Sequence, residues 1–495
     1  MIFPQSLFYS LMPCLILAKE ASYQKSEEDS SGYSLIQIVP NSNENIELLQ
    51  YLDRNIDAGG MDFWSPPAML GKPVLLLLHP ELSELAKNLF VQQNMAIYLP
   101  NLTELIMAEN LQLAIEEERF NSSDEAATAQ SLGQYPFNFF TYNTLQEISN
   151  YVTHVSQNTA NYNAMPRLNV SHSNIGTTHE GRPINMLSLS LKDGKEKAAI
   201  WLDCGIHARE WISPAFCIYA IDQIVRHPKE LLSMYDFYIV PVVNPDGYAH
   251  TWLSNDDVRC DSGRLETGDF CRLWRMNRQP SKGRGWKSST QSKRQFNLKI
   301  QFQDAINNFL GTPSHQKISG GLTSDSSLQQ VGKGARGPFR RSSLSNLASQ
   351  FDSTTKCIGI DLNRNFDMDW NTTGSSDNPC ADTYHGPLAF SEKESQAVRD
   401  ATLKINSTQK IASHVSIHSY SQMWLYPYGT VKRGNSTHRE DLDRVANISV
   451  SALTSLYGTE YRYGRAWEVL DANGSYQAGG NSVDWAHEKV ISFVY

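Results

Sequence analysis

The chain has 495 residues, a formal net charge of −9 and a hydrophobic share of 40%. This length is sufficient for two domains with large buried cores, and the acidic balance argues against a nucleic-acid partner. No apolar stretch beyond the N-terminus is long enough to span a membrane, so we expect no membrane partner.

The N-terminal segment, residues 1–21, is typical of a secretory signal peptide. It is mostly apolar, with Leu7, Leu11 and Leu15 among its side chains, and the small Ala21 lies near a plausible cleavage point. The usual basic residue near the start is absent, and a buried N-terminal strand is the alternative. Loss of the signal removes Cys14, and the remaining cysteines form an even set that suits an oxidising compartment. We therefore expect a secreted, extracellular protein.

A small α+β unit is predicted at residues 33–99, because short apolar strands alternate there with segments of helical spacing. The strands are expected at residues 33–39, 74–78 and 95–99, and the helices at residues 46–52 and 82–90. This order is that of a ferredoxin-like or open-sandwich module.

The segment that joins this unit to the rest of the chain, residues 108–134, is acidic at Glu116–Glu118. Arg119 is its only basic side chain. A trypsin-like protease would therefore cut the segment after Arg119. An uncut linker is the alternative.

From Pro136 onward, helical and strand patterns alternate, which predicts an α/β fold. Helices are expected at residues 145–155 and 439–456, and strands at residues 184–189, 198–202, 237–243 and 411–417. Asn244–Gly247 is expected to form a turn, and Ser391 with Glu394 a capping box at a helix start. We expect a mixed, mostly parallel twisted sheet flanked by helices, with ligands beyond the carboxyl ends of its strands.

Residues 281–352 interrupt this alternation. Between Lys282 and Arg341 there are 11 Lys or Arg residues, whereas Asp304 and Asp325 are the only acids. Apolar periodicity is poor, so we expect a basic low-complexity insert that is disordered or makes a surface excursion. A lineage-specific loop, an error in the gene model and a basic patch for an acidic partner are the interpretations that stay open.

His207 and Glu210 lie three residues apart, just after the strand predicted at residues 198–202. An isolated H-x-x-E is weak, because a chain with 13 histidines contains roughly one such match by chance. Here the context is stronger. Gly205 allows a sharp exit from the strand, and Ser213–Pro214 predicts the N-cap and first position of a helix.

A third metal ligand is predicted at His418, which follows the strand expected at residues 411–417. A catalytic zinc ion uses about three protein ligands and keeps one position open for water. Two neutral imidazoles and one carboxylate leave the ion with residual positive charge, with which it can polarise a carbonyl and acidify bound water. The alternative is that these histidines are structural.

Together with Asp361–Asn365 and Ser419–Gln422, this region resembles the zinc metallocarboxypeptidases of the pancreatic A/B type. The resemblance extends over nearly the whole chain and implies a carboxypeptidase-like fold, one Zn²⁺ ion and peptide or protein C-termini as substrates. Residues 33–99, with Asp62–Trp64, resemble the activation segment that covers the active-site cleft in this family. The implied organisation is a signal peptide at 1–21, an activation domain at 22–119 with a linker to about 134, and a zinc carboxypeptidase domain at 135–495.

The resemblance also implies roles for individual residues. His207, Glu210 and His418 would bind zinc, and Asp361 would orient His207. Arg278 would stabilise the oxyanion. Asn363, Arg364 and Tyr476 would hold the terminal carboxylate of the peptide, Arg209, Ser419 and Tyr420 would guide its chain, and Val483 would form the base of the side-chain pocket. An apolar residue at that base favours aromatic or aliphatic C-terminal residues.

Neighbouring cysteines along the chain suggest three disulfides, Cys204–Cys217, Cys260–Cys271 and Cys357–Cys380. The first and third spacings resemble bridges of the family, and other pairings stay open.

The family's general base is a glutamate that would follow the strand predicted at residues 490–495, beyond Tyr495. The sequence therefore predicts a secreted carboxypeptidase proenzyme with an aromatic or aliphatic preference. The alternative is an inactive paralogue that keeps zinc and peptide binding, or an incomplete gene model.

Overall fold

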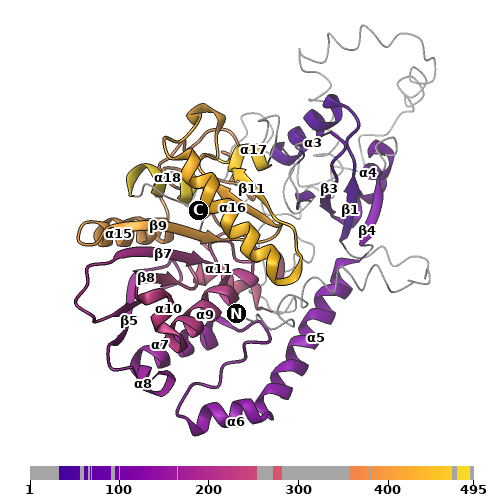
Figure 1. Cartoon of the computed structure of the whole chain (residues 1–495). Coiled ribbons are helices and arrows are strands. Elements are labelled where there is room, and N and C mark those ends of the chain that lie inside the picture. The colour runs from indigo at the N-terminus through magenta and orange to yellow at the C-terminus, as the bar shows by residue number, and fades with distance from the viewer. Residues whose placement is uncertain are drawn as a thin grey trace, which may run out of the picture.

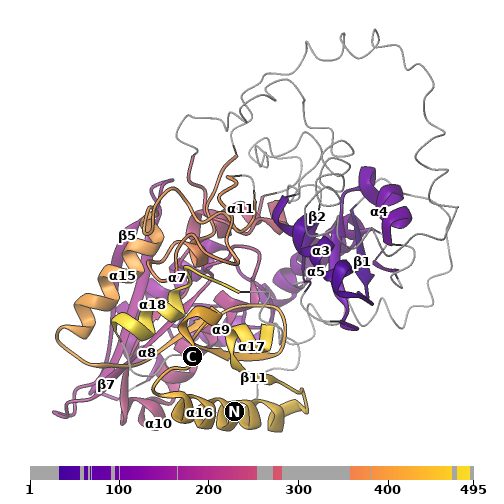
Figure 2. The same ribbon diagram turned by 90° about the horizontal axis from the view of Figure 1, so that it is seen from above.

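The computed structural model describes residues 33–55, 61–64, 67, 70–90, 95–99, 101–163, 165–253, 271–280, 357–379, 381–470 and 477–490. The predicted signal peptide, the basic insert at 281–352, Cys260, Cys380 and Tyr476 lie outside these residues. Figures 1 and 2 show a small N-terminal unit beside a larger body, with one long helix leading from the first to the second.

The N-terminal unit is a four-stranded antiparallel sheet with two helices. Its elements are β1 (Ser34–Ile38), α3 (Asn43–Asn55), β2 (Met61–Phe63), β3 (Val74–Leu78), η1 (Pro80–Leu82), α4 (Ser83–Phe90) and β4 (Ala96–Leu99). The strand order is β2-β3-β1-β4. Apolar side chains from the strands and both helices, including Ile38, Leu49, Leu76 and Phe90, form one core. The predicted α+β open sandwich is confirmed, although β2 was not predicted.

Two helices, α5 (Leu102–Asn121) and α6 (Asp124–Ser131), connect the units, so the predicted joining segment is largely helical. Arg119 lies in the last turn of α5. Its side chain is 79% exposed and its guanidinium lies 3.8 Å from the carboxylate of Glu116.

The larger body is an α/β domain around a five-stranded sheet. Its elements are α7 (Leu145–Gln157), α8 (Thr159–Tyr162), β5 (Leu168–Thr177), β6 (Pro183–Leu191), β7 (Ala198–Cys204), α9 (Ile212–Arg226), α10 (Pro228–Leu232), β8 (Tyr235–Val240), α11 (Pro245–Thr251), η2 (Cys271–Leu273), η4 (Leu362–Arg364), α15 (Lys393–Asn406), β9 (Ile411–Ile417), β10 (Met423–Tyr426), η5 (Val431–Arg433), α16 (Arg439–Tyr457), β11 (Arg462–Arg465), α17 (Ala466–Leu470) and α18 (Ser482–Lys489). The sheet order is β5-β6-β8-β7-β9, and β10 pairs with β11 in a separate parallel ribbon.

The predicted mixed sheet with flanking helices is confirmed. Strands β8, β7 and β9 run parallel, whereas β5, β6 and β8 pair antiparallel. Leu187 and Leu202 face a core shared with α7 and α9, whereas Met186 and Trp201 face a second core shared with α15 and α18. Because neighbouring residues of a strand point to opposite faces, this alternation places helices on both sides of the sheet.

Three predicted local features are wrong. Helix α9 begins at Ile212, and the hydroxyl of Ser213 does not cap it but accepts from the N–H of Gly205 and donates to the carbonyl of Ile417. The segment Asn244–Gly247 is not an isolated turn, because Asn244 caps α11. Helix α15 begins after Glu392, whose side chain makes no capping bond. Ser213, Asn244 and Glu392 each also contact a distant segment, which a local pattern does not reveal.

Of the predicted disulfides, Cys204–Cys217 is present and ties the end of β7 to α9. Cys271 and Cys357 are also disulfide-bonded. Their predicted partners lie outside the described residues, so those two pairings stay predictions. Among the described helices, none has the length and apolar character needed to cross a bilayer.

Two fully buried carboxyl groups, Glu392 and Glu394, meet at the start of α15. Both accept from the side-chain amide of Asn277, at 2.7 and 3.1 Å, and His179 Nε2 lies 3.3 Å from Glu392. Burial raises the pKa of Glu394 to about 7, and the nearby charge of Glu392 adds to this effect.

Glu394 should make the protein less stable as pH rises. The unfolded chain ionises this group near its ordinary pKa of 4.5, whereas the folded chain holds the proton up to about 7. Its stabilising contribution is therefore full below pH 4.5 and is lost as pH rises through about 7. We expect Glu394→Gln to match the parent in urea unfolding at about pH 4 and to be more stable than it at about pH 8. The control is Glu440→Gln, a change of an exposed glutamate. If the free energy of unfolding of Glu394→Gln differed from that of the parent by the same amount at both pH values, the assignment would be contradicted.

Candidate metal centre

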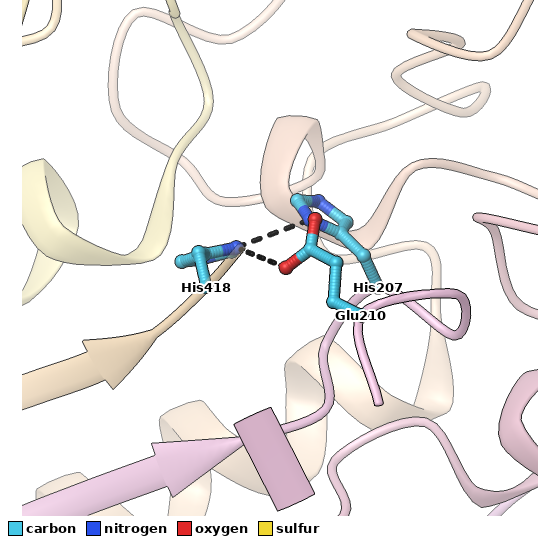
Figure 3. Close-up of side chains that lie close together, drawn as sticks. All are labelled: His207, Glu210 and His418. Atoms are coloured by element: carbon cyan, nitrogen blue, oxygen red, sulfur yellow. Dashed lines mark hydrogen bonds and ion pairs between the residues drawn. The ribbon is translucent and has the colours of Figure 1, made fainter. Parts of the chain in front are cut away.

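Three predicted ligands come together at the carboxyl ends of β7 and β9 (Figure 3). His207 follows β7, Glu210 precedes α9, and His418 follows β9 directly. The two strands are parallel neighbours with Cys204 opposite Ile417, so the turns that follow them lie side by side. Ser213 reinforces this arrangement, because its hydroxyl bridges the backbones of Gly205 and Ile417.

The donor atoms of these side chains lie close to one another. His207 Nδ1 lies 2.7 Å from Glu210 Oε1, and His418 Nδ1 lies 3.0 Å from Glu210 Oε2. The two Nδ1 atoms are 3.1 Å apart. The ligand atoms of a tetrahedral zinc ion are separated by about 3.3 Å, since Zn–N and Zn–O bonds are about 2.0–2.2 Å long. Geometry and donor chemistry therefore both fit a zinc ion.

Burial and charge also fit a metal site. The side chains of His207 and Glu210 are 4% and 8% exposed, whereas that of His418 is 31% exposed, so the centre is accessible from one side. Burial alone would raise the pKa of Glu210, but the imidazoles of His207 and His418 hold it well below its ordinary value. The group is therefore an ionised carboxylate.

Asp361 lies behind His207, as predicted. Its Oδ1 is 3.2 Å from His207 Nε2 and also accepts from the backbone N–H of Asn363. Burial alone would raise the pKa of this fully buried carboxyl, but Arg275 and His207 lower it well below its ordinary value. A carboxylate in this position fixes the imidazole so that Nδ1 faces the centre.

Arg275 is a site residue that the sequence interpretation missed. Its guanidinium donates to Asp361 Oδ2 at 3.0 and 3.2 Å and lies 3.6 Å from Glu210 Oε1. The predicted Arg278 instead stacks over Trp274 and lies 3.8 Å from Glu180. The structure therefore brings Arg275 to the centre, whereas the role predicted for Arg278 stays a prediction. The two arginines are three positions apart, and only the packing of residues 275–278 on Asp361 distinguishes them.

Of the other predicted substrate-binding residues, Asn363 and Ser419 contact the candidate ligands. Asn363 Nδ2 lies 3.4 Å from His418 Nε2, and its Oδ1 accepts from the N–H of Ser482 at the start of α18. Arg364 is buried and donates to the carbonyls of Gly374 and Asn363. The N–H of Ser419 donates to Glu210 Oε2.

Val483 lies next to Ser482 on α18 and packs partly buried against the core that contains Trp485. Tyr476, which was predicted to close over the peptide end, is outside the described residues.

The N-terminal unit lies over Arg209 and Tyr420. Asp62 of β2 pairs with the Arg209 guanidinium at 2.7 Å, and the ring of Trp64 lies 6.4 Å from that of Tyr420, centroid to centroid. Burial raises the pKa of Asp62 even though Arg209 acts in the opposite direction. The unit therefore pairs with Arg209 and borders Tyr420, two residues that were predicted to contact the substrate.

A second ion pair joins α5 to the larger domain. Glu109 accepts two hydrogen bonds from Arg272, at 2.8 and 3.3 Å. The Arg272 guanidinium also stacks over Trp211 and donates to the carbonyl of Arg209. The contacts of Asp62 and Glu109 are thus connected through neighbouring arginines.

The fold and the site define a metal-binding α/β domain that follows a small α+β unit. A family model described as zinc carboxypeptidase matches residues 157–495, and one described as carboxypeptidase activation peptide matches residues 36–118. The chain therefore belongs to the zinc carboxypeptidase family and is a metallocarboxypeptidase by that membership. The predicted resemblance and the predicted zinc cofactor are confirmed. An activation peptide also implies a protease that removes it.

Individual relatives agree with this assignment. Carboxypeptidase A2 of Rattus norvegicus is 28% identical over 492 residues, which cover 97% of this chain and 89% of the relative. Carboxypeptidase B of Bos taurus is 33% identical over 332 residues, which cover 66% of this chain and 57% of the relative.

Two solved structures share the fold. Carboxypeptidase A of Helicoverpa armigera has a TM-score of 0.65 at 24% identity, covering 95% of this chain and 88% of that structure. Thrombin activatable fibrinolysis inhibitor has a TM-score of 0.62 at 24% identity, covering 94% of this chain and 90% of that structure.

Loss of any of the three ligands should abolish stoichiometric zinc binding. We expect His207→Ala, Glu210→Ala and His418→Ala to lose the bound ion after dialysis, because about three protein ligands are needed to hold it. Elemental analysis together with the protein concentration measures the zinc content. His172→Ala, an exposed histidine of β5, is the control. Retention of a full complement of zinc by any of the three variants would remove that residue from the site.

Proposed function

We propose that this protein is the secreted proenzyme of a zinc carboxypeptidase that removes aromatic or aliphatic C-terminal residues. The observation that carries the proposal is the meeting of His207, Glu210 and His418 at 2.7–3.1 Å beside Arg275. Secretion is supported by the apolar segment at residues 1–21 and by the even number of cysteines that remain once Cys14 is removed with that segment.

The three ligands would hold a zinc ion, which supplies Lewis acidity toward a peptide carbonyl and lowers the pKa of its bound water. Arg275 would stabilise the negative charge that develops on the carbonyl oxygen, since it is a fixed cation within 3.6 Å of Glu210. Its bond to Asp361 holds it in place before substrate arrives. No described residue is assigned the role of general base.

Recognition of a free C-terminus requires a fixed cation for its carboxylate. We assign this role to Arg364, supported by Asn363 and by Tyr476, because a guanidinium binds carboxylates with two parallel hydrogen bonds. Arg209, Ser419 and Tyr420 would guide the upstream part of the peptide. The short link from Asn363 to Ser482 supports Val483 as a neighbour of the pocket.

The activation unit would be released after a cut at Arg119. This residue is exposed, and α5 ends two residues later, where helices fray readily. The proposed activation domain therefore extends from residue 22 to the cut, and the proposed enzyme domain begins near residue 135.

The proposed function is tested with trypsin-treated protein and peptides that differ only in their last residue. We expect chelator-sensitive release of Phe and Leu at least about tenfold faster than release of Lys or Glu, because an apolar pocket base disfavours a charge. Val483→Asp should move the preference toward Lys, whereas Ile448→Asp on the exposed part of α16 should not. Untreated protein and Arg119→Gln should release little of any residue.

Two outcomes would contradict this proposal. Equal release from all peptides would remove Val483 as the determinant of specificity. Binding of zinc and of the Phe-ending peptide without release would show recognition without hydrolysis.

Arg275 and Arg278 should differ in their effects on turnover. We expect Arg275→Gln to lower kcat/KM by about 10²–10³, as for loss of an oxyanion donor, and Arg278→Gln to lower it by less than about tenfold. Thermal unfolding of both variants checks that they fold. The opposite order of effects would return the oxyanion role to Arg278.

A further inference from the structure

The two candidate zinc-binding imidazoles present the same nitrogen to the centre. Each directs Nδ1 at Glu210 and leaves Nε2 on its outer side (Figure 3). His207 Nε2 faces the carboxylate of Asp361 directly, at 3.2 Å. His418 Nε2 instead lies 3.4 Å from the hydroxyl oxygen of Ser416. A ligand histidine is oriented by a group that accepts a hydrogen bond from its outer nitrogen. The hydrogen bonds of Ser416 therefore decide whether Ser416 can accept from His418 Nε2.

Ser416 is tied to a buried carboxylate, Asp203. The Ser416 hydroxyl lies 2.6 Å from Asp203 Oδ1, and the two residues are directly opposite each other in the parallel pairing of β7 and β9. Asp203 is 1% exposed, and its Oδ2 accepts from the indole N–H of Trp201 at 2.7 Å. The alternation of side chains along β9 puts Ser416 on the same face of the strand as the following His418.

This contact determines which groups Ser416 can offer to His418. The Ser416 hydroxyl donates to Asp203 Oδ1, so its single hydrogen points to Asp203. The oxygen of Ser416 then presents only lone pairs to His418 Nε2. An imidazole that donates from Nε2 carries no proton on Nδ1, and this is the form whose Nδ1 can bind a metal ion.

A second contact of His418 Nε2 favours the opposite tautomer of the imidazole. The amide nitrogen of Asn363 also lies 3.4 Å from His418 Nε2, and its orientation is fixed because the amide oxygen accepts from Ser482. An amide N–H that faces Nε2 favours a proton on Nδ1, the form that cannot bind the ion. The contact with Ser416 opposes this preference at the same distance, and the hydrogen bond from Ser416 to Asp203 fixes the direction of that contact.

We propose that Asp203, acting through Ser416, is a positioning residue that holds His418 in the metal-binding orientation and tautomer. It is the counterpart of Asp361 for His207, with one hydroxyl inserted. The proposal rests on the proposed role of His418 as a zinc ligand. It assigns a function to the buried carboxylate of Asp203.

The test measures zinc affinity by competition with a chromogenic chelator, using the full proenzyme chain. We expect Ser416→Ala and Asp203→Asn each to weaken zinc binding by about 10- to 100-fold, the usual effect of removing a group that orients a metal ligand. The double variant should be no weaker than the worse single variant, because both changes interrupt one relay. Ser416→Thr keeps the hydroxyl and should restore affinity to within about threefold of the parent.

Controls separate this proposal from the one on which it rests. Ser413→Ala, on β9 but three positions before Ser416, should bind zinc like the parent. His418→Ala should lose zinc; if it does not, the assignment of His418 as a ligand fails, and not the proposed relay from Asp203 through Ser416.

If His418→Ala loses zinc while Ser416→Ala and Asp203→Asn bind it like the parent, the relay is overturned. Fully additive losses in the double variant would also overturn it. Thermal unfolding of the zinc-free proteins checks folding, and if Asp203→Asn does not fold, the comparison of Ser416→Ala with Ser416→Thr decides.

Discussion

The parallel pairing of β7 with β9 is the constraint on which the candidate site depends. In this register Cys204 lies opposite Ile417, so the chain leaves both strands at the same edge of the sheet and carries His207 and His418 with it. A slip of one residue would turn the side chains of β9 to the other face and separate the two imidazoles. The Ser213 hydroxyl hydrogen-bonds to the backbone at both strand ends and so supports the pairing, and the Cys204–Cys217 disulfide ties the end of β7 to α9.

Charge balance at the centre follows from this geometry. Glu210 and Asp361 are two buried carboxylates on either side of His207, which would be costly without compensation. Arg275 contacts both and offsets part of their charge, and a divalent ion at the imidazoles would offset the rest. The same arginine therefore stabilises the folded site and, in the proposed reaction, would place a cation beside the peptide carbonyl. These two roles explain why the position tolerates burial of a guanidinium.

The sequence predicted the parts of the molecule that local patterns encode. Apolar periodicity gave the two units and most of their strands, and the motif context placed His207, Glu210 and His418 at strand ends. The sequence-based prediction failed for side chains that bind residues far away along the chain. Ser213 and Ser391 resemble caps but bind other segments, and Arg275 cannot be separated from Arg278 without the packing against Asp361. The relay through Ser416 depends on strand register, which periodicity alone does not give.

The contacts of the activation unit explain how such a site can be kept latent. Asp62 occupies the guanidinium of Arg209, the residue proposed to guide the peptide, and Glu109 occupies Arg272. Both acids precede Arg119, so a cut there leaves them on the released side of the chain while their ion pairs are still intact. Cleavage then changes only the connectivity, and exposure of the centre requires the unit to dissociate. Because both ion pairs are partly buried and would have to separate before the unit leaves, they favour the latent state even after the chain is cut.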